Sequence, residues 1–374
     1  MIRGTLIRGA VGTLFVAALA ACGRERGPVN IGVVFPPANT PLAFLAADQI
    51  NAAGGIHGRP VVIVPDTIAD VAEPADLEIR RARSIVGRAK VVGVVGHGGS
   101  RGSLAAAPVY NEARVVELVP TGTSRLLALA GPWTLALPPN DSVEGAFIAR
   151  FVRDRFQART VAIFYINDEY GIGLRDGLLA AFGKSGVRVL SDARYDLASN
   201  LAVLVDAAVA GGVPDVLIVA GRAGQTAAIA RRLRELRLPT RVVAGDGSHE
   251  FPGLVQAAGP AAEGIFVVTF WLPGAAGDTA SERFVRDVRR RLSREPASSD
   301  VMIYDGVRLL ATAVAEVGDD PDRVLRYLKE LGRSRPRYRG IVGEIGFGEG
   351  AGPPRFTMGV VRGATIVPAE PTPR

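Results

Sequence analysis

Cysteine, histidine and lysine are scarce in this 374-residue sequence, which contains one Cys and three His. A single cysteine cannot form a disulfide within the chain, so a disulfide-built fold is excluded. The histidines, His57, His97 and His249, lie far apart, so a Cys/His zinc cluster is not expected. We predict neither a metal nor a cofactor. Disorder is also excluded, because 48% hydrophobic and only 22% charged residues can form a large core.

The basic residues are almost all arginine, because lysine occurs only at positions 90, 184 and 329. The formal net charge is +7, from 44 Lys+Arg against 37 Asp+Glu. Arginine replaces lysine in a chain that is also rich in glycine and alanine, which indicates a compositional bias. Basic charge without a nucleic-acid-binding motif specifies no such partner, so we expect no nucleic acid to bind.

The first 22 residues have the pattern of an export signal. Arg3 and Arg8 precede an uncharged run, Ala10–Ala21, which is shorter than the roughly 20 apolar residues of a membrane span. The run ends in Leu-Ala-Ala before Cys22 and resembles the lipobox of bacterial lipoproteins. We therefore predict a signal peptide over 1–21, lipidation of Cys22 and a polar tether over 22–28. An ordinary signal peptide with a chance cysteine is the alternative.

Lipidation would make the only thiol a membrane attachment point and leave the folded part without cysteine chemistry. No later segment reaches spanning length without charge, so we expect a domain tethered outside the cytoplasmic membrane.

The rest of the chain alternates short β-branched runs with amphipathic helical patterns, which predicts α/β units with parallel sheets. The pattern restarts near Pro138–Asp141, so two units follow each other. The last helices and a predicted closing hairpin, 338–347 with 357–361, are too few for a third core and should cap the earlier units. Residues 368–374 are predicted to be disordered.

The predicted strands are 30–35, 59–64, 91–96, 115–118, 160–166, 187–190, 216–220, 241–244 and 265–269. The predicted helices are 41–53, 74–88, 103–113, 124–130, 142–156, 171–184, 201–210, 224–236, 280–292, 301–317 and 321–331.

One motif suggests a serine hydrolase. Gly98–Gly102 matches G-x-S-x-G between a predicted strand and helix, and Asp246 and His249 follow in the chain order of that class. Asp246 and His249 are only three residues apart, whereas a triad's acid and base normally converge from separate loops. Hydrolysis by Ser100 is therefore kept as a minor alternative. Arg101 breaks the G-x-G-x-x-G pattern of dinucleotide sites.

Two turns rich in Gly, Ser and Thr, 97–103 and 120–124, follow neighbouring strands. Free N–H groups at helix starts can hold a carboxylate, and Ser100 and Thr123 could add hydroxyl donors. Simple N-caps are the alternative for each residue. Ligands of parallel α/β sheets bind at the carboxyl ends of strands, so two adjacent turns of this kind favour a binding site.

The order of motifs resembles the type I periplasmic solute-binding proteins of branched-chain amino acid ABC transporters. The resemblance covers about 30–361 and rests on six segments behind the lipobox. These segments are DQINAAGGIHG from Asp48, the turn 94–103, PTGTS from Pro120, NDEYGIGL from Asn167, GPAAEGI from Gly259 and YDGV from Tyr304.

The resemblance implies an α/β fold with two Rossmann-like lobes, joined by three hinge crossovers and closing on a ligand. Lobe 1 would comprise 29–138 and 273–339, and lobe 2 would comprise 139–272 and 340–367. The implied function is reversible capture of an amino acid or small carboxylate, without catalysis, for delivery to a membrane permease of an ABC transporter.

The resemblance also implies roles for individual residues. Ser100, Gly122 and Thr123 would hold the ligand carboxylate, Tyr170 would cover the ligand, and Asp246 would receive its ammonium group. A turn role for Asp246 and plain packing for Tyr170 are the alternatives.

Two departures from the family bear on the ligand. Residues 35–41 form a shortened loop where the family has a pocket wall. Arg222 replaces a frequent aromatic residue and Arg101 follows Ser100, so we expect a ligand with a second acidic group or a different carboxylate. A surface salt bridge is the alternative for Arg222. A regulatory or sensory lipoprotein with the same fold is the alternative function.

Overall fold

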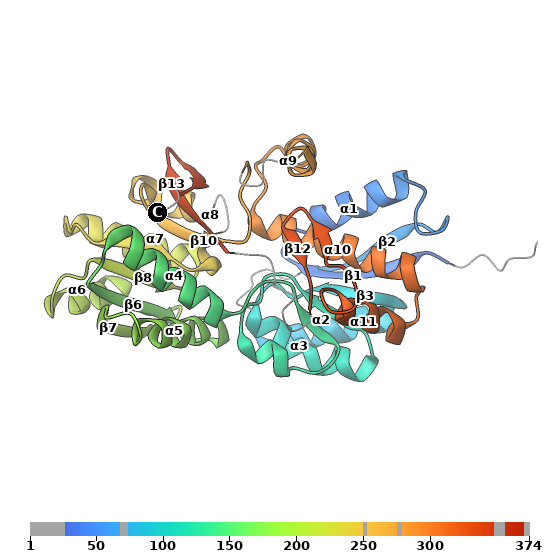
Figure 1. Cartoon of the computed structure of the whole chain (residues 1–374), viewed down its shortest axis with the longest axis horizontal. Helices are drawn as coiled ribbons and strands as arrows, with labels where there is room; N and C mark the ends of the chain where they lie inside the picture. Colours follow the sequence, from blue (N-terminus) through green and yellow to red (C-terminus); the bar gives the residue numbers. More distant parts are fainter. Residues whose placement is uncertain (1–26, 68–73, 250–252, 275–278, 348–355, 370–374) are drawn as a thin grey trace, which may run out of the picture.

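The computed structural model describes residues 27–67, 74–249, 253–274, 279–347 and 356–369. Cys22 and the predicted signal peptide lie outside these residues. Two α/β lobes lie side by side along the long axis of the molecule (Figure 1). No helix in the described ranges has both the length and the apolar character that crossing a membrane requires.

The first lobe contains a parallel sheet of order β2-β1-β3-β4-β5. Every residue of β3 is buried, as expected for a strand covered on both faces. The strands are β1 (Val29–Phe35), β2 (Val61–Thr67), β3 (Val91–Gly96), β4 (Val116–Val119) and β5 (Thr134–Ala136). The helices among these strands are α1 (Pro41–Ala52), α2 (Ala75–Arg88), α3 (Ser100–Ala113) and the 3₁₀ helix η1 (Arg125–Leu129).

The second lobe contains a seven-stranded sheet of order β14-β13-β10-β9-β8-β6-β7. Its central strands are parallel, whereas β13 and β14 pair antiparallel at one edge. The strands are β6 (Thr160–Ile166), β7 (Arg188–Tyr195), β8 (Val216–Ala220), β9 (Arg241–Ala244), β10 (Phe266–Thr269), β13 (Thr357–Arg362) and β14 (Thr365–Pro368). The helices are α4 (Asp141–Phe156), α5 (Glu169–Phe182), α6 (Leu201–Ala210), α7 (Ala223–Glu235), α8 (Gly253–Ala258) and the 3₁₀ helices η2 (Asp246–Ser248) and η3 (Gly259–Ala262).

The chain then returns to the first lobe with α9 (Thr279–Leu292), α10 (Ser298–Val317) and α11 (Pro321–Glu330). Helix α10 packs directly on β3, where a Cβ at Gly93 would lie 2.8 Å from the Leu310 side chain. The glycine therefore lets the helix lie close to the sheet. The chain crosses between the sheets after β5, after β10 and between the hairpin described next and β13.

The predicted closing hairpin is wrong. Strands β11 (Tyr338–Gly340) and β12 (Gly343–Ile345) pair with each other, whereas β13 pairs with β10 and β14. The 341–342 backbone N–H groups donate to the buried Asp305 carboxylate of α10, and the Phe347 N–H donates to the Leu331 carbonyl. Residues 340–347 thus pack with the first lobe, although the resemblance assigned them to the second.

Other differences are local. The predicted helix 124–130 is the short 3₁₀ helix η1, and β5 and α8 were not predicted. Pro368, assigned to the disordered tail, ends β14 and pairs with Gly359, while 370–374 lie outside the described residues.

Candidate functional site

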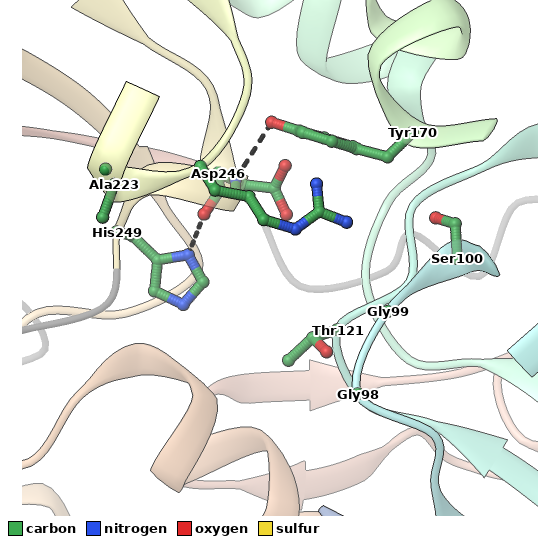
Figure 2. Close-up of a pocket in the computed structure, with 11 residues that line it drawn as sticks. Gly98, Gly99, Ser100, Thr121, Tyr170, Ala223, Asp246 and His249 are labelled. Atoms are coloured by element: carbon green, nitrogen blue, oxygen red, sulfur yellow. Dashed lines mark hydrogen bonds between the residues drawn. The ribbon is translucent and has the colours of Figure 1, made fainter. Parts of the chain in front are cut away.

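A cavity of about 210 Å³ lies between the lobes. Its walls come from turns at the carboxyl ends of β3, β4, β8 and β9 and from the start of α5, as expected for α/β sheets. Ser100 lies on one side, and Asp246 and His249 lie on the other (Figure 2). The lining residues are Gly98, Gly99, Ser100, Thr121, Tyr170, Arg222, Ala223, Gly224, Asp246, Gly247 and His249.

Four predicted site residues line this cavity: Ser100, Tyr170, Arg222 and Asp246. Gly122, Thr123 and Arg101 do not line it. The shortened loop is also absent from the walls, and its Asn39 side chain donates instead to Asp300 of α10 at 3.1 Å. The loop therefore contacts the body of the first lobe and not the cavity.

Ser100 begins α3 and connects the two first-lobe turns, 97–103 and 120–124, through hydrogen bonds. Its Oγ accepts hydrogen bonds from the backbone N–H groups of Thr123 and Ser124, each at 3.1 Å. Both acceptor positions of the hydroxyl are thereby used, and its proton remains available to a ligand acceptor. Gly122 is tightly enclosed, because a Cβ there would lie 2.7 Å from Val119 and 3.3 Å from the Gly99 backbone. Gly122 and Thr123 thus support Ser100 from outside the cavity wall.

Tyr170 connects α5 to the turn after β9. Its hydroxyl accepts a hydrogen bond from the Gly247 N–H at 2.9 Å (Figure 2). Asp168 caps α5 by accepting from the N–H groups of Tyr170 and Gly171. Burial raises the pKa of Tyr170 well above its usual value, and the nearby Asp246 and Glu144 add to the effect. The phenol therefore stays protonated and can donate to a carboxylate.

Asp246 is buried and has a neighbour that the sequence analysis missed. Its backbone N–H donates to Oε1 of Glu144 on α4 at 2.7 Å, across 102 residues of chain. The second oxygen of Glu144 and Oδ1 of Asp246 are buried without hydrogen-bond partners. Burial raises the pKa of both carboxyls, and each carboxyl also perturbs the other.

Glu144 reaches this position because α4 and α5 touch through glycines. A Cβ at Gly145 would lie 2.4 Å from the Gly177 carbonyl carbon, so only glycine permits this backbone approach. In the sequence, Glu144 looks like an acidic residue in a helix's first turn, where the helix dipole alone explains it.

Arg222 forms a salt bridge within the cavity wall. Its Nη2 lies 3.0 Å from Oδ2 of Asp168, and the two side chains are 18% and 6% exposed. Its Nη1 is buried without a hydrogen-bond partner. The protein thus supplies the counter-charge of Arg222, which removes part of the reason to expect a second acidic group on the ligand.

Arg101 lies outside the cavity and bridges the lobes. Its guanidinium is 3.8 Å from the carboxylate of Glu169 on α5, and the side chains are 44% and 37% exposed. Arg101 lines a separate hollow with Ser124, Asn167 and Glu169. The structure therefore places Arg101 away from the cavity that Ser100 and Asp246 line.

The hydrolase alternative lacks the required geometry. Ser100 Oγ accepts from backbone N–H groups, and His249 Nδ1 faces the backbone carbonyl of Asp246. Within the described residues, no hydrogen bond joins the side chains of Ser100, His249 and Asp246. Ser100 is thus placed as a donor without an adjacent base.

Unsatisfied polar atoms gather at this cavity. Buried polar groups normally have partners, so such a cluster requires an explanation such as an absent ligand. Within the described ranges, no group of three or more His, Cys, Asp or Glu side chains is arranged to hold a metal ion. Among the residues that line the cavity, the buried atoms without partners are Arg222 Nη1, Asp246 Oδ1 and His249 Nε2, and Glu144 Oε2, on the residue bonded to Asp246, is a further one.

Known proteins of similar sequence are amino acid-binding proteins. The Periplasmic binding protein family matches residues 43–365. An "Amino acid binding protein" of Pseudomonas aeruginosa is 27% identical, covering 77% of this chain and 76% of its own length. A "Leu/Ile/Val-binding protein homolog 1" of Brucella abortus is 24% identical and covers 93% of this chain and 94% of its own length.

Solved structures show the same fold. A leucine-binding protein from Thermotoga maritima superimposes with a TM-score of 0.81 at 22% identity, covering 91% of this chain and 97% of that one. A branched-chain amino acid substrate-binding protein from Streptococcus pneumoniae, in complex with isoleucine, gives 0.81 at 21% identity with the same coverage. The predicted two-lobed α/β fold is confirmed. Because the family match spans most of the chain, this protein belongs to the periplasmic binding protein family, whose members are transporter binding proteins and not enzymes.

Proposed function

We propose that this chain is the substrate-binding protein of an ABC importer and captures an amino acid or related small carboxylate between its lobes. The observation that carries the proposal is the set of buried, unpartnered donors and acceptors around the interlobe cavity. A bound zwitterion would give these groups partners and would remove the free-energy cost of leaving them unpaired.

The two lobes offer opposite chemistry to such a ligand. The Ser100 hydroxyl and the start of α3 would donate to the carboxylate. Asp246 would accept from the ammonium group, and the Tyr170 ring would cover the ligand. A ligand that contacts both lobes at once stabilises the closed arrangement and thereby shifts the open–closed equilibrium.

The size and charge of the cavity favour a small ligand with an uncharged side chain. The cavity has a volume of about 210 Å³. Arg222 pairs with Asp168 and Arg101 with Glu169, so the protein supplies a counter-charge to each arginine, although Arg222 Nη1 remains without a hydrogen-bond partner. One relative is named for leucine, isoleucine and valine, and one protein of similar fold was solved in complex with isoleucine. These amino acids are therefore the first candidates for the ligand.

The family places this chain outside the cytoplasm. We further propose that cleavage precedes Cys22, that a lipid on Cys22 anchors the protein, and that a membrane permease receives the solute.

A thermal-shift screen of the mature protein against amino acids and small carboxylates tests the proposal. A ligand present at a hundred times its Kd stabilises the folded state by about 2.7 kcal/mol. We expect leucine, isoleucine or valine to raise Tm, and Asp246→Asn to abolish the rise. If no solute stabilises the protein, the solute-capture function is wrong and a regulatory or sensory role is favoured.

A further inference from the structure

Two buried carboxyl groups meet on the second-lobe side of the cavity. Glu144 on α4 is fully buried, and Asp246, after β9, is 2% exposed. Glu144 Oε1 accepts from the Asp246 N–H at 2.7 Å, while Glu144 Oε2 and Asp246 Oδ1 have no partner. The Glu144 carboxyl therefore lies against the Asp246 backbone, and both carboxyls are buried with an oxygen that the protein leaves unpaired. Two negative charges buried close together without a cation would cost a large amount of free energy, so we expect one of the two carboxyls to keep a proton.

The surroundings of this pair do not neutralise a second negative charge. Asp141, one turn earlier on α4, adds a like charge, whereas the Tyr170 hydroxyl and His249 favour ionisation of Asp246. Arg222 is held by Asp168. Among the described residues, no ion pair joins Glu144 or Asp246 to a cation. Burial raises the pKa of Glu144 well above its usual value, with Asp246 as the next cause.

We propose that Glu144 and Asp246 share one proton in the empty site and that the ammonium group of the ligand replaces it, so that capture releases a proton. The proposal rests on the proposed function, in which Asp246 receives the ammonium. The proton leaves the carboxyl pair for solvent or buffer, and the ammonium keeps its own three. With the proton, the pair carries one negative charge. Without the proton, it carries two negative charges that face the single positive charge of the ammonium. Counted together with the ammonium, the charge at the pair is therefore unchanged by capture.

Proton release makes affinity depend on pH. Where the empty pair is protonated, the proton competes with the ammonium, so affinity increases as pH rises. Release of one proton corresponds to a change in Kd of up to about tenfold per pH unit. Glu144 therefore acts as a positioning residue that sets how strongly the site favours a cation at a given pH.

Calorimetric titration of leucine into the mature protein, in buffers of different ionisation enthalpy, counts the protons released. We expect close to one proton per leucine from the wild type at a pH below the raised pKa of the carboxyl pair, and fewer at a higher pH. Glu144→Gln keeps an acceptor for the Asp246 N–H and removes the titrating group, so it should bind leucine with almost no proton release and a flat pH profile.

Glu117→Gln is the matched control. Glu117 is a fully buried carboxyl in the first lobe, bonded to Thr134 at 2.9 Å, and burial raises its pKa as well. This variant should release as many protons on binding as the wild type. The wild-type titration is informative even if a variant fails to fold, because absence of proton release there overturns the proposal. Equal release by the wild type and Glu144→Gln also overturns it.

A ligand-free measurement separates this proposal from the proposed function. A carboxyl with a raised folded-state pKa keeps its proton in the folded state while the unfolded chain loses it, so the free energy of unfolding falls as pH rises through that interval. In Glu144→Gln this fall should be smaller than in the wild type. If no amino acid binds the wild type, the proposed function is wrong. If the pH profiles of the free energy of unfolding are also parallel for the wild type and Glu144→Gln, the proposal of a shared proton is wrong as well.

Discussion

The two lobes have similar α/β folds, but they differ in which buried polar groups near the cavity have hydrogen-bond partners within the protein. In the first lobe, His97 is fully buried between Glu78 at 2.7 Å and the Tyr110 hydroxyl at 2.9 Å, and Glu117, which does not line the cavity, accepts from Thr134 with one oxygen and leaves the other unpaired. These bonds lie within one lobe and need no ligand. In the second lobe, Asp246 and Glu144 keep buried oxygens without partners beside the cavity.

This difference indicates that the two lobes contribute differently to ligand binding. The first lobe presents a neutral, internally bonded wall in which Ser100 is already oriented by two backbone N–H groups. The second lobe presents charge that is only partly compensated. A charged group costs more free energy to leave unpaired than a neutral one, so ligand affinity should depend most strongly on the second lobe.

The strongest test of this comparison is Asp246→Ala. Removing the acceptor for the ammonium should weaken binding by at least about 100-fold, since losing one partner of a buried charge pair costs about 3–5 kcal/mol. Calorimetric titration with leucine measures the effect. Asp206→Ala, which removes a surface partner of Arg232, is the control and should bind normally. Unchanged affinity in Asp246→Ala would contradict the role of the second lobe.

A smaller effect is expected from the first lobe. Ser100→Ala removes a ligand donor and the acceptor for two N–H groups, and should weaken binding roughly 10- to 100-fold, or about 1–3 kcal/mol. Ser103→Ala serves as a control because Ser103 Oγ accepts from the His97 N–H at 3.2 Å and does not line the cavity. A larger loss in Ser100→Ala than in Asp246→Ala would reverse the comparison.

Tyr110→Phe tests whether the polar network of the first lobe is structural. The change leaves one nitrogen of the buried His97 without its partner, which should lower the free energy of unfolding by about 1–3 kcal/mol. Leucine affinity should stay within about twofold of the wild type. Chemical denaturation and titration of the same sample measure both quantities, and a large loss of affinity would show that the network serves the ligand.

The smallest effect is expected where the lobes meet at the surface. Arg101→Ala removes an exposed contact of 3.8 Å with Glu169, and exposed ion pairs contribute about 0.2–1 kcal/mol. Leucine affinity should fall by less than about fivefold, and high salt should remove the difference from the wild type. Arg153→Ala, which breaks a surface pair with Asp154 inside one lobe, should leave affinity unchanged.

Much of the fold was predictable because its signals are local. β8 and β9 begin and end where the apolar runs predicted, and β3 is buried along its length. The pairing of β13 was not predictable, because either a hairpin with β12 or addition to β10 satisfies the same short apolar run. The Asp305 carboxylate holds the 341–342 turn against α10, and this contact between distant segments separates β12 from β13.

Local patterns in the sequence were enough to predict the alternation of strands and helices, the family, and the turns expected to face a ligand. Which charges meet at those turns depends on how distant segments pack. Arg101 and Arg222 look alike in the sequence, yet Arg101 bridges the lobe surfaces and Arg222 lines the cavity beside Asp168. Glu144 joins Asp246 only because glycines let α4 and α5 touch. Helix and strand patterns are encoded by near neighbours, whereas a buried pair of charges depends on packing between segments that are distant in the chain.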